Sequence, residues 1–147
     1  NYVRERIFRN AKRMGYHLCS FVESTVLRYE NLKFGENVFI SGTSALQPYV
    51  TVGFNTFIIG AKIGHHSAIG DHCLLSCCKL AGGVDVGNRT FIGMNSTIKQ
   101  RVKIGYDNII GMGSIISEDT GNGEVYSNTN TTRKMSFPAE RIRDQYM

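Results

Sequence analysis

Large aliphatic side chains recur along the chain every five or six residues, from position 34 to position 116. Fourteen of these fifteen positions hold Ile, Val or Leu. The series is Phe34, Ile40, Leu46, Val52, Ile58, Ile63, Ile69, Leu75, Leu80, Val86, Ile92, Ile98, Ile104, Ile110 and Ile116. A period of six does not fit the helical period of about 3.6 residues. The pattern therefore predicts very short β-strands separated by sharp corners.

A second series of mostly small or β-branched residues stands two positions before each large aliphatic residue from Ile40 onward. It runs Val38, Ser44, Val50, Thr56, Ala61, Ser67, Cys73, Cys78, Val84, Thr90, Ser96, Val102, Asn108 and Ser114. Alternate side chains of a strand point to the same side, so both series are predicted to fill the interior. Cys73 and Cys78 are accordingly interpreted as small buried residues.

Three six-residue units close one triangular coil, and the repeat is long enough for about five coils stacked about 4.8 Å apart. Glycine directly follows eight of the large aliphatic residues. We expect these glycines to allow corner backbone angles that a Cβ would obstruct. The predicted fold class is all-β, with the coils over residues 24–119.

Both ends of the chain break the repeat. Residues 1–23 are predicted to form a helix and a strand, with Val3, Ile7, Ala11 and Met14 on one helix face and Gly15 as the helix stop. Residues 120–147 are predicted to form a loop rich in Gly, Asn, Ser and Thr, followed by a C-terminal tail.

Charge and composition exclude several classes of protein. The net charge is +5, but residues 1–33 hold seven Lys/Arg against three Asp/Glu, so the repeat itself is almost neutral. It offers no basic surface for nucleic acid. No stretch reaches the ~18 apolar residues of a membrane span. The four cysteines contain no CxxC pair, so we interpret them as reduced thiols of a cytoplasmic protein, without a structural zinc site.

The repeated aliphatic-Gly pattern resembles the left-handed parallel β-helix of hexapeptide-repeat acyltransferases, in particular sugar acetyltransferases of the NeuD/PglD type. The resemblance implies the left-handedness. It also implies that residues 1–23 are the remnant of an N-terminal nucleotide-sugar-binding domain, and that the protein is a homotrimer. Phe39, Phe57 and Phe91 each precede a large aliphatic residue by one position, so we expect them to point outward into a subunit interface.

The segment Ile63-Gly64-His65-His66-Ser67 resembles the coil that carries the catalytic histidine of this family. The resemblance implies that His65 is the general base, a task that suits histidine because its usual pKa is about 6.5. His66 stands where the family has an acidic residue and is the candidate orienting neighbour. Because neighbouring side chains of an extended chain diverge, we nevertheless expect its ring to point elsewhere.

The resemblance further implies acetyl-CoA as cosubstrate and no metal. Leu74 stands where many family members have a histidine that contacts the thioester. Met94, Gly111, Met112 and Gly113 fall at the corners that face the pantetheine arm. The two methionines fit the filling of a subunit interface nearly as well.

The expected activity is transfer of an acetyl group from acetyl-CoA to an amino or hydroxyl group of a sugar or nucleotide sugar, for surface glycan biosynthesis. Two alternatives remain open at this point. One is a γ-type carbonic anhydrase, a metalloenzyme of the same fold that would use His65, His66 and His72. The other is a catalytically silent scaffold.

Overall fold

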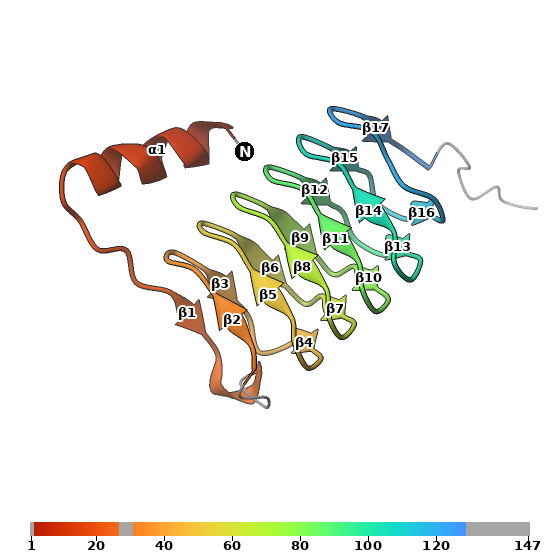
Figure 1. Ribbon diagram of the computed structural model, residues 1–147, viewed down its shortest axis with the longest axis horizontal. Coiled ribbons are helices and arrows are strands. Elements are labelled where there is room, and N and C mark those ends of the chain that lie inside the picture. Colours follow the sequence, from red (N-terminus) through yellow and green to blue (C-terminus); the bar gives the residue numbers. More distant parts are fainter. Residues whose placement is uncertain (1, 27–30, 129–147) are drawn as a thin grey trace, which may run out of the picture.

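The computed structural model describes residues 2–26 and 31–128, so the predicted C-terminal tail lies outside the described residues. One helix, α1 (Tyr2–Arg13), precedes a parallel β-solenoid (Figure 1). A short 3-10 turn, η1 (Ser24–Val26), lies between the first strand and the rest of the solenoid. The predicted left-handed parallel β-helix is confirmed.

Three parallel sheets form the sides of a triangular prism. Sheet A contains, in spatial order, β1 (Phe21–Val22), β3 (Phe39–Ile40), β6 (Phe57–Ile59), β9 (Leu74–Ser76), β12 (Phe91–Ile92), β15 (Ile109–Ile110) and β17 (Val125–Tyr126). Sheet B contains β2 (Lys33–Phe34), β5 (Thr51–Val52), β8 (Ala68–Ile69), β11 (Asp85–Val86) and β14 (Lys103–Ile104). Sheet C contains β4 (Ala45–Leu46), β7 (Lys62–Ile63), β10 (Lys79–Leu80), β13 (Thr97–Ile98) and β16 (Ile115–Ile116).

The chain visits the sheets in the order B, A, C, so each coil has three corners, here named BA, AC and CB. Two coils are one residue shorter than the others. The pairing of β6 with β9, and that of β9 with β12, each have a spacing of seventeen residues instead of eighteen. Both shortened turns lie at the AC corner, at Gly60 and Cys77, where the backbone is left-handed. The strands β1 and β17 extend sheet A on either side of residues 24–119.

The two predicted inward series form the core. All fourteen small residues and fourteen of the fifteen large ones are buried. Phe34 is the exception, with 41% of its surface exposed, because β2 is the edge strand of sheet B. Cys73 and Cys78 are buried as predicted, and burial raises the pKa of each thiol to about 12.

The glycines that follow the large aliphatic residues were expected to adopt corner backbone angles that a Cβ would obstruct. This expectation is wrong. The left-handed backbone occurs two residues later, at positions such as His66 and Arg89. The glycines are required for space. A Cβ on Gly64 would lie 2.5 Å from backbone atoms of Ala81 and Gly82 in the next coil.

Helix α1 forms as predicted, and Gly15 beyond its end has a φ of +85°. The helix lies along the BA corners of the solenoid (Figure 1). The contacts, however, come from Arg4, Phe8 and Lys12, while Val3 and Ile7 of the predicted apolar face are 62% and 61% exposed. In the described part of the chain, no helix is long and apolar enough to cross a membrane.

Candidate active site

His65 stands at the CB corner between β7 and β8, and both neighbouring coils fix its backbone. Its N–H donates to Gln47 Oε1 of the preceding coil at 3.0 Å. Its carbonyl oxygen accepts a hydrogen bond from the N–H of Gly83 in the following coil at 2.8 Å. The backbone of this exposed residue is therefore held by the stacking of the coils.

The imidazole of His65 lies against the backbone of the next coil. A Cβ on Gly82 would come within 2.7 Å of His65 Nε2 and 2.8 Å of Cε1. Glycine at position 82 thus leaves the space that the ring occupies. Real Cβ atoms do not approach other atoms so closely, so any larger residue would displace the ring or the coil.

His66 contacts His65, contrary to the expectation that its ring would point elsewhere. The Nδ1 atoms of the two rings are 3.0 Å apart, and the rings meet edge to face. The ring of His66 also stacks on Tyr49 of the preceding coil, with centroids 4.7 Å apart. The left-handed backbone at His66, with a φ of 57°, breaks the alternation that separates neighbours in a regular strand.

His65 borders a pocket of about 390 Å³ on the outer face of sheet C. Polar groups reach this pocket from three coils: Gln47 from the coil before His65, Lys62 and His65 from the same coil, and Gln100 from the second coil after it. The remaining lining is small or aliphatic: Ala45, Ile63, Gly64, Leu80, Ala81 and Gly82. A small polar substrate that reaches His65 would meet hydrogen-bonding groups together with one positive charge.

The residues expected to bind the donor lie elsewhere in the chain. Met94, Gly111, Met112 and Gly113 are at the AC corner, the opposite edge of sheet C from His65. Met94 and Met112 are 46% and 69% exposed. Gly113 has the left-handed φ of +71° that favours glycine. A single chain therefore does not bring these residues to His65.

Leu74 is also separate from the His65 pocket. It lies on the outer face of sheet A, between Phe57 and Phe91 in adjacent strands. Together with Tyr2, Val3, Arg4 and Ile7 of α1, it lines an apolar hollow of about 570 Å³.

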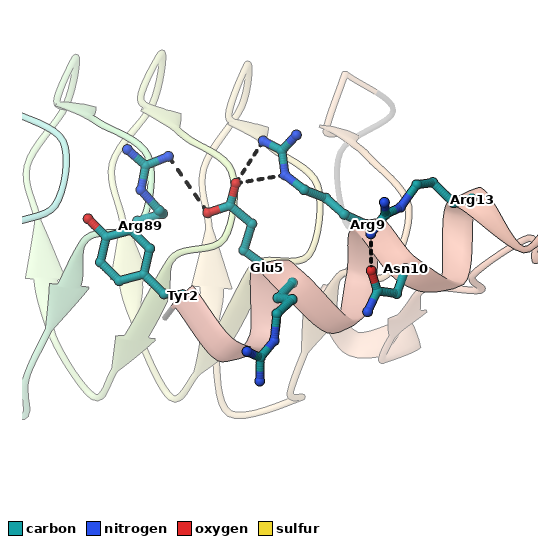
Figure 2. Close-up of a pocket in the computed structure, with 7 residues that line it drawn as sticks. Tyr2, Glu5, Arg9, Asn10, Arg13 and Arg89 are labelled. Carbon is teal, nitrogen blue, oxygen red and sulfur yellow. Dashed lines mark hydrogen bonds and ion pairs between the residues drawn. The ribbon is translucent and has the colours of Figure 1, made fainter.

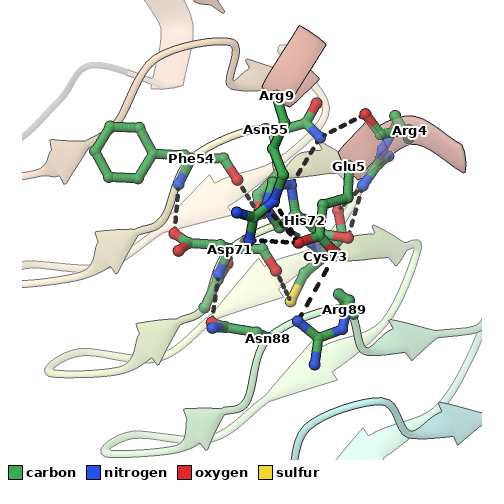
Figure 3. A network of polar contacts seen from close by, with 12 residues as sticks. Arg4, Glu5, Arg9, Phe54, Asn55, Asp71, His72, Cys73, Asn88 and Arg89 are labelled. Atoms are coloured by element: carbon green, nitrogen blue, oxygen red, sulfur yellow. Dashed lines mark hydrogen bonds and ion pairs between the residues drawn. The ribbon is translucent and has the colours of Figure 1, made fainter. Parts of the chain in front are cut away.

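His72 occupies the BA corner and is buried beneath α1 (Figure 3). Its Nδ1 is 2.8 Å from Asn55 Nδ2, and its Nε2 is 3.8 Å from Glu5 Oε1. Burial lowers its pKa, and the nearby Glu5 carboxylate opposes that effect. The three histidines of the alternative metal site thus lie at two different corners. Within the described residues, no group of three His, Cys, Asp or Glu side chains is placed to hold a metal.

Sequence reasoning missed three neighbours of the histidine pair. Gln47 and Tyr49 precede His65 and His66 by one coil, and Gly82 follows by one coil. A coil length of seventeen or eighteen residues, counted from His65 in both directions, is the signal that could have found them.

Comparisons with known proteins agree with this architecture. No protein-family model matches the chain. The acyl-[acyl-carrier-protein]–UDP-N-acetylglucosamine O-acyltransferase of Pseudomonas paraeruginosa is 34% identical over 105 residues, which are 69% of this chain and 41% of the relative. The chain thus spans less than half the length of the curated relatives that it matches.

Solved structures give a longer match. PerB from Caulobacter crescentus, in complex with CoA and GDP-perosamine, is 28% identical with a TM-score of 0.81, over 85% of this chain and 61% of that one. The perosamine N-acetyltransferase of the same organism was also crystallised with both molecules as variants in which one histidine is replaced. The acetyltransferase domain of PglB from Neisseria gonorrhoeae has a TM-score of 0.81 over 84% of this chain and 62% of that one; at 18% identity it supports the fold alone.

These comparisons and the described fold identify the class. The chain is a hexapeptide-repeat, left-handed β-helix protein. Among its structural neighbours, the perosamine N-acetyltransferase at 26% identity is a sugar acetyltransferase, in keeping with the NeuD/PglD type.

Proposed function

We propose that this protein transfers an acetyl group from acetyl-CoA to an amino or hydroxyl group of a sugar or nucleotide sugar. The observation that carries the proposal is the contact of His66 with His65, which borders a polar pocket. The fold is shared with PerB, which was solved with CoA and GDP-perosamine. The acceptor is a precursor for surface glycans, and the reaction takes place in the cytoplasm.

In this proposal His65 is the general base. Two neutral histidines with their Nδ1 atoms 3.0 Å apart form a hydrogen bond only when one donates and the other accepts. With His65 Nδ1–H as donor, its Nε2 keeps a lone pair for the acceptor proton. The stacking of His66 on Tyr49 holds the accepting ring in place. His66 therefore replaces the acidic neighbour of related enzymes as a neutral positioning residue.

The proton then follows a short path. As the acceptor nitrogen or oxygen attacks the thioester carbonyl, Nε2 of His65 takes its proton. When the carbon–sulfur bond breaks, the same Nε2–H protonates the departing thiolate. His65 returns to its starting state, so no metal and no covalent enzyme intermediate is required. Lys62 and the two glutamines of the pocket are available to bind the sugar.

We further propose that the active site forms between copies of the chain in a homotrimer. His65 and the residues assigned to the donor, Met94 and Met112, lie at opposite edges of sheet C. In a trimer, the AC corner of one copy can lie beside the CB corner, and hence His65, of its neighbour. In this arrangement Gly111 and Gly113 let the pantetheine arm approach the backbone, while Leu74 lies outside the contact with the donor.

An apolar ladder on sheet A supports the trimer. Each of the seven strands carries an outward apolar residue: Phe21, Phe39, Phe57, Leu74, Phe91, Ile109 and Val125. The corresponding positions on sheet B are Lys33, Thr51, Ala68, Asp85 and Lys103. A continuous apolar stripe of this length is typical of a protein–protein contact.

The proposal is tested by following free thiol release from acetyl-CoA with purified protein, with and without nucleotide amino sugars and their hydroxyl analogues. Release that depends on a nucleotide sugar is the expected result. Acyl-carrier-protein thioesters form a second donor arm, because the curated relative is named for that donor. No acceptor-dependent release from either donor would reject the proposed activity.

A further inference from the structure

A second pocket, away from the proposed active site, lies between α1 and the BA corner (Figure 2). Its volume is about 320 Å³. Its lining consists of Tyr2, Glu5, Arg6, Arg9, Asn10, Arg13 and Arg89. His65 stands at the CB corner, at the other edge of sheet B. The proposed acetyl transfer therefore does not explain why four arginines line this pocket.

Three of the arginines share one face of α1. Arg6, Arg9 and Arg13 are separated by three and four residues, so their side chains are neighbours on the helix surface. Like charges at this spacing repel one another and destabilise an isolated helix. A bound anion would remove that repulsion.

Carboxylates already neutralise part of this charge. Glu5 Oε1 lies 2.7 Å from an Arg9 nitrogen, and Glu5 Oε2 lies 3.8 Å from Arg89. Asp107 receives two hydrogen bonds from Arg89, at 2.7 and 2.9 Å, and this pairing raises the pKa of the arginine. Arg9 and Arg89 are thereby largely compensated.

Arg6 and Arg13 are not compensated in this way. Arg13 donates to the side-chain oxygen of Asn10, which carries no charge. Within residues 2–26 and 31–128, no carboxylate pairs with Arg6 or Arg13. The pocket consequently holds two guanidinium groups whose positive charge is unmatched, beside two that carboxylates hold in position.

We propose that this pocket binds the diphosphate group of a nucleotide. Guanidinium groups match phosphate oxygens in charge and in their forked geometry. A volume of about 320 Å³ suits a small anion rather than a protein segment. The Tyr2 ring, with its centroid 5.6 Å from the central carbon of the Arg89 guanidinium, offers a surface on which a base can stack.

Both CoA and a nucleotide sugar carry a diphosphate, and calorimetric titrations distinguish these sources. Pyrophosphate, UDP and CoA are titrated separately into the protein. Binding of pyrophosphate and of at least one nucleotide is expected, with an affinity that falls as the salt concentration rises. Tighter binding of UDP than of CoA assigns the pocket to the nucleotide sugar, and the reverse order assigns it to the donor.

Variants locate the binding. Arg6→Gln combined with Arg13→Gln should weaken binding of the preferred nucleotide about tenfold or more. Lys33→Gln combined with Lys103→Gln removes the same charge from the outer face of sheet B and should leave the affinity unchanged. Circular dichroism verifies that both double variants stay folded. Absence of binding by all three probes, or an equal loss in both double variants, would overturn the proposal. Thiol release is measured independently, so this result does not depend on the proposed activity.

Discussion

His65 and His66 are neighbours in the chain, and their Nδ1 atoms lie 3.0 Å apart. The contact depends on the left-handed backbone at His66 and on the Tyr49 ring stacked against it. We propose that His66 takes the place of the acidic neighbour that the family resemblance implies. In our account its task is to accept one hydrogen bond.

Replacement of His66 tests this positioning role. His66→Gly removes the ring without strain at a φ of 57°, and we expect kcat to fall about tenfold with little change in KM. Asparagine also tolerates this backbone and offers a carbonyl acceptor, so His66→Asn should retain more activity than the glycine variant. Steady-state kinetics of both variants give the comparison. Full activity of His66→Gly would show that His65 needs no partner at this position.

Alanine substitutions at the neighbouring Gly82 and Gly83 test whether the ring of His65 needs the space beside Gly82. The Cβ of Gly82→Ala would lie 2.7 Å from His65 Nε2, so we expect activity to fall about tenfold or more through displacement of the ring. The Cβ of Gly83→Ala meets only Arg101 Cγ at 3.4 Å, but its φ is +70°. That variant should lose about 1–2 kcal/mol of stability and keep its activity. Thermal unfolding and thiol release separate the two effects, and the opposite pattern would refute this explanation.

The buried His72 makes the stability of the fold depend on pH. Burial lowers its pKa below the usual value of about 6.5, with Glu5 and Asp71 opposing this and Arg9 and Arg4 adding to it. The unfolded chain therefore binds more protons at this residue. Its contribution is fully present above about pH 6.5 and is lost as pH falls through the lowered pKa.

Melting temperatures measured between about pH 7.5 and pH 5 test this dependence. His72→Asn, at a position with a φ of 60°, should show a smaller decrease over this range than the unmodified protein. His17→Asn at an exposed position is the control and should follow the unmodified protein. Identical curves for all three proteins would mean that His72 does not contribute.

If the apolar ladder on sheet A is the trimer contact, a charged residue introduced there should prevent trimer formation. Phe91→Glu places a carboxylate in the middle of the ladder on sheet A, where burial between copies would be costly. We expect the mass from light scattering to fall from three times 16.4 kDa to that of one chain. Thr51→Glu on the outer face of sheet B should stay trimeric. A protein that is already monomeric before substitution would contradict the proposed trimer.

The six-residue period and the sizes of the inward residues were sufficient to predict the solenoid and its core. Each inward position accepts either a large aliphatic residue, such as Ile63, or a small one, such as Cys73, and both are buried. The family resemblance implied that His65 is the general base, and this assignment stays a prediction. The sequence did not predict the contact with His66, since that depends on a backbone angle and on a ring one coil away. The docking face of α1 was missed because Arg4 and Phe8 contact the BA corner, while the apolar Val3 and Ile7 remain exposed.

The most direct test of the central claim is the turnover number of His65→Ala. We predict that kcat for acceptor-dependent thiol release falls roughly 10²–10⁴-fold, the usual contribution of a positioned general base. The KM for acetyl-CoA should change little, because the residues assigned to the donor lie at the AC corner. His17→Ala serves as the control and should retain its activity. Full activity in a folded His65→Ala protein would contradict the assignment of His65 as the catalytic base.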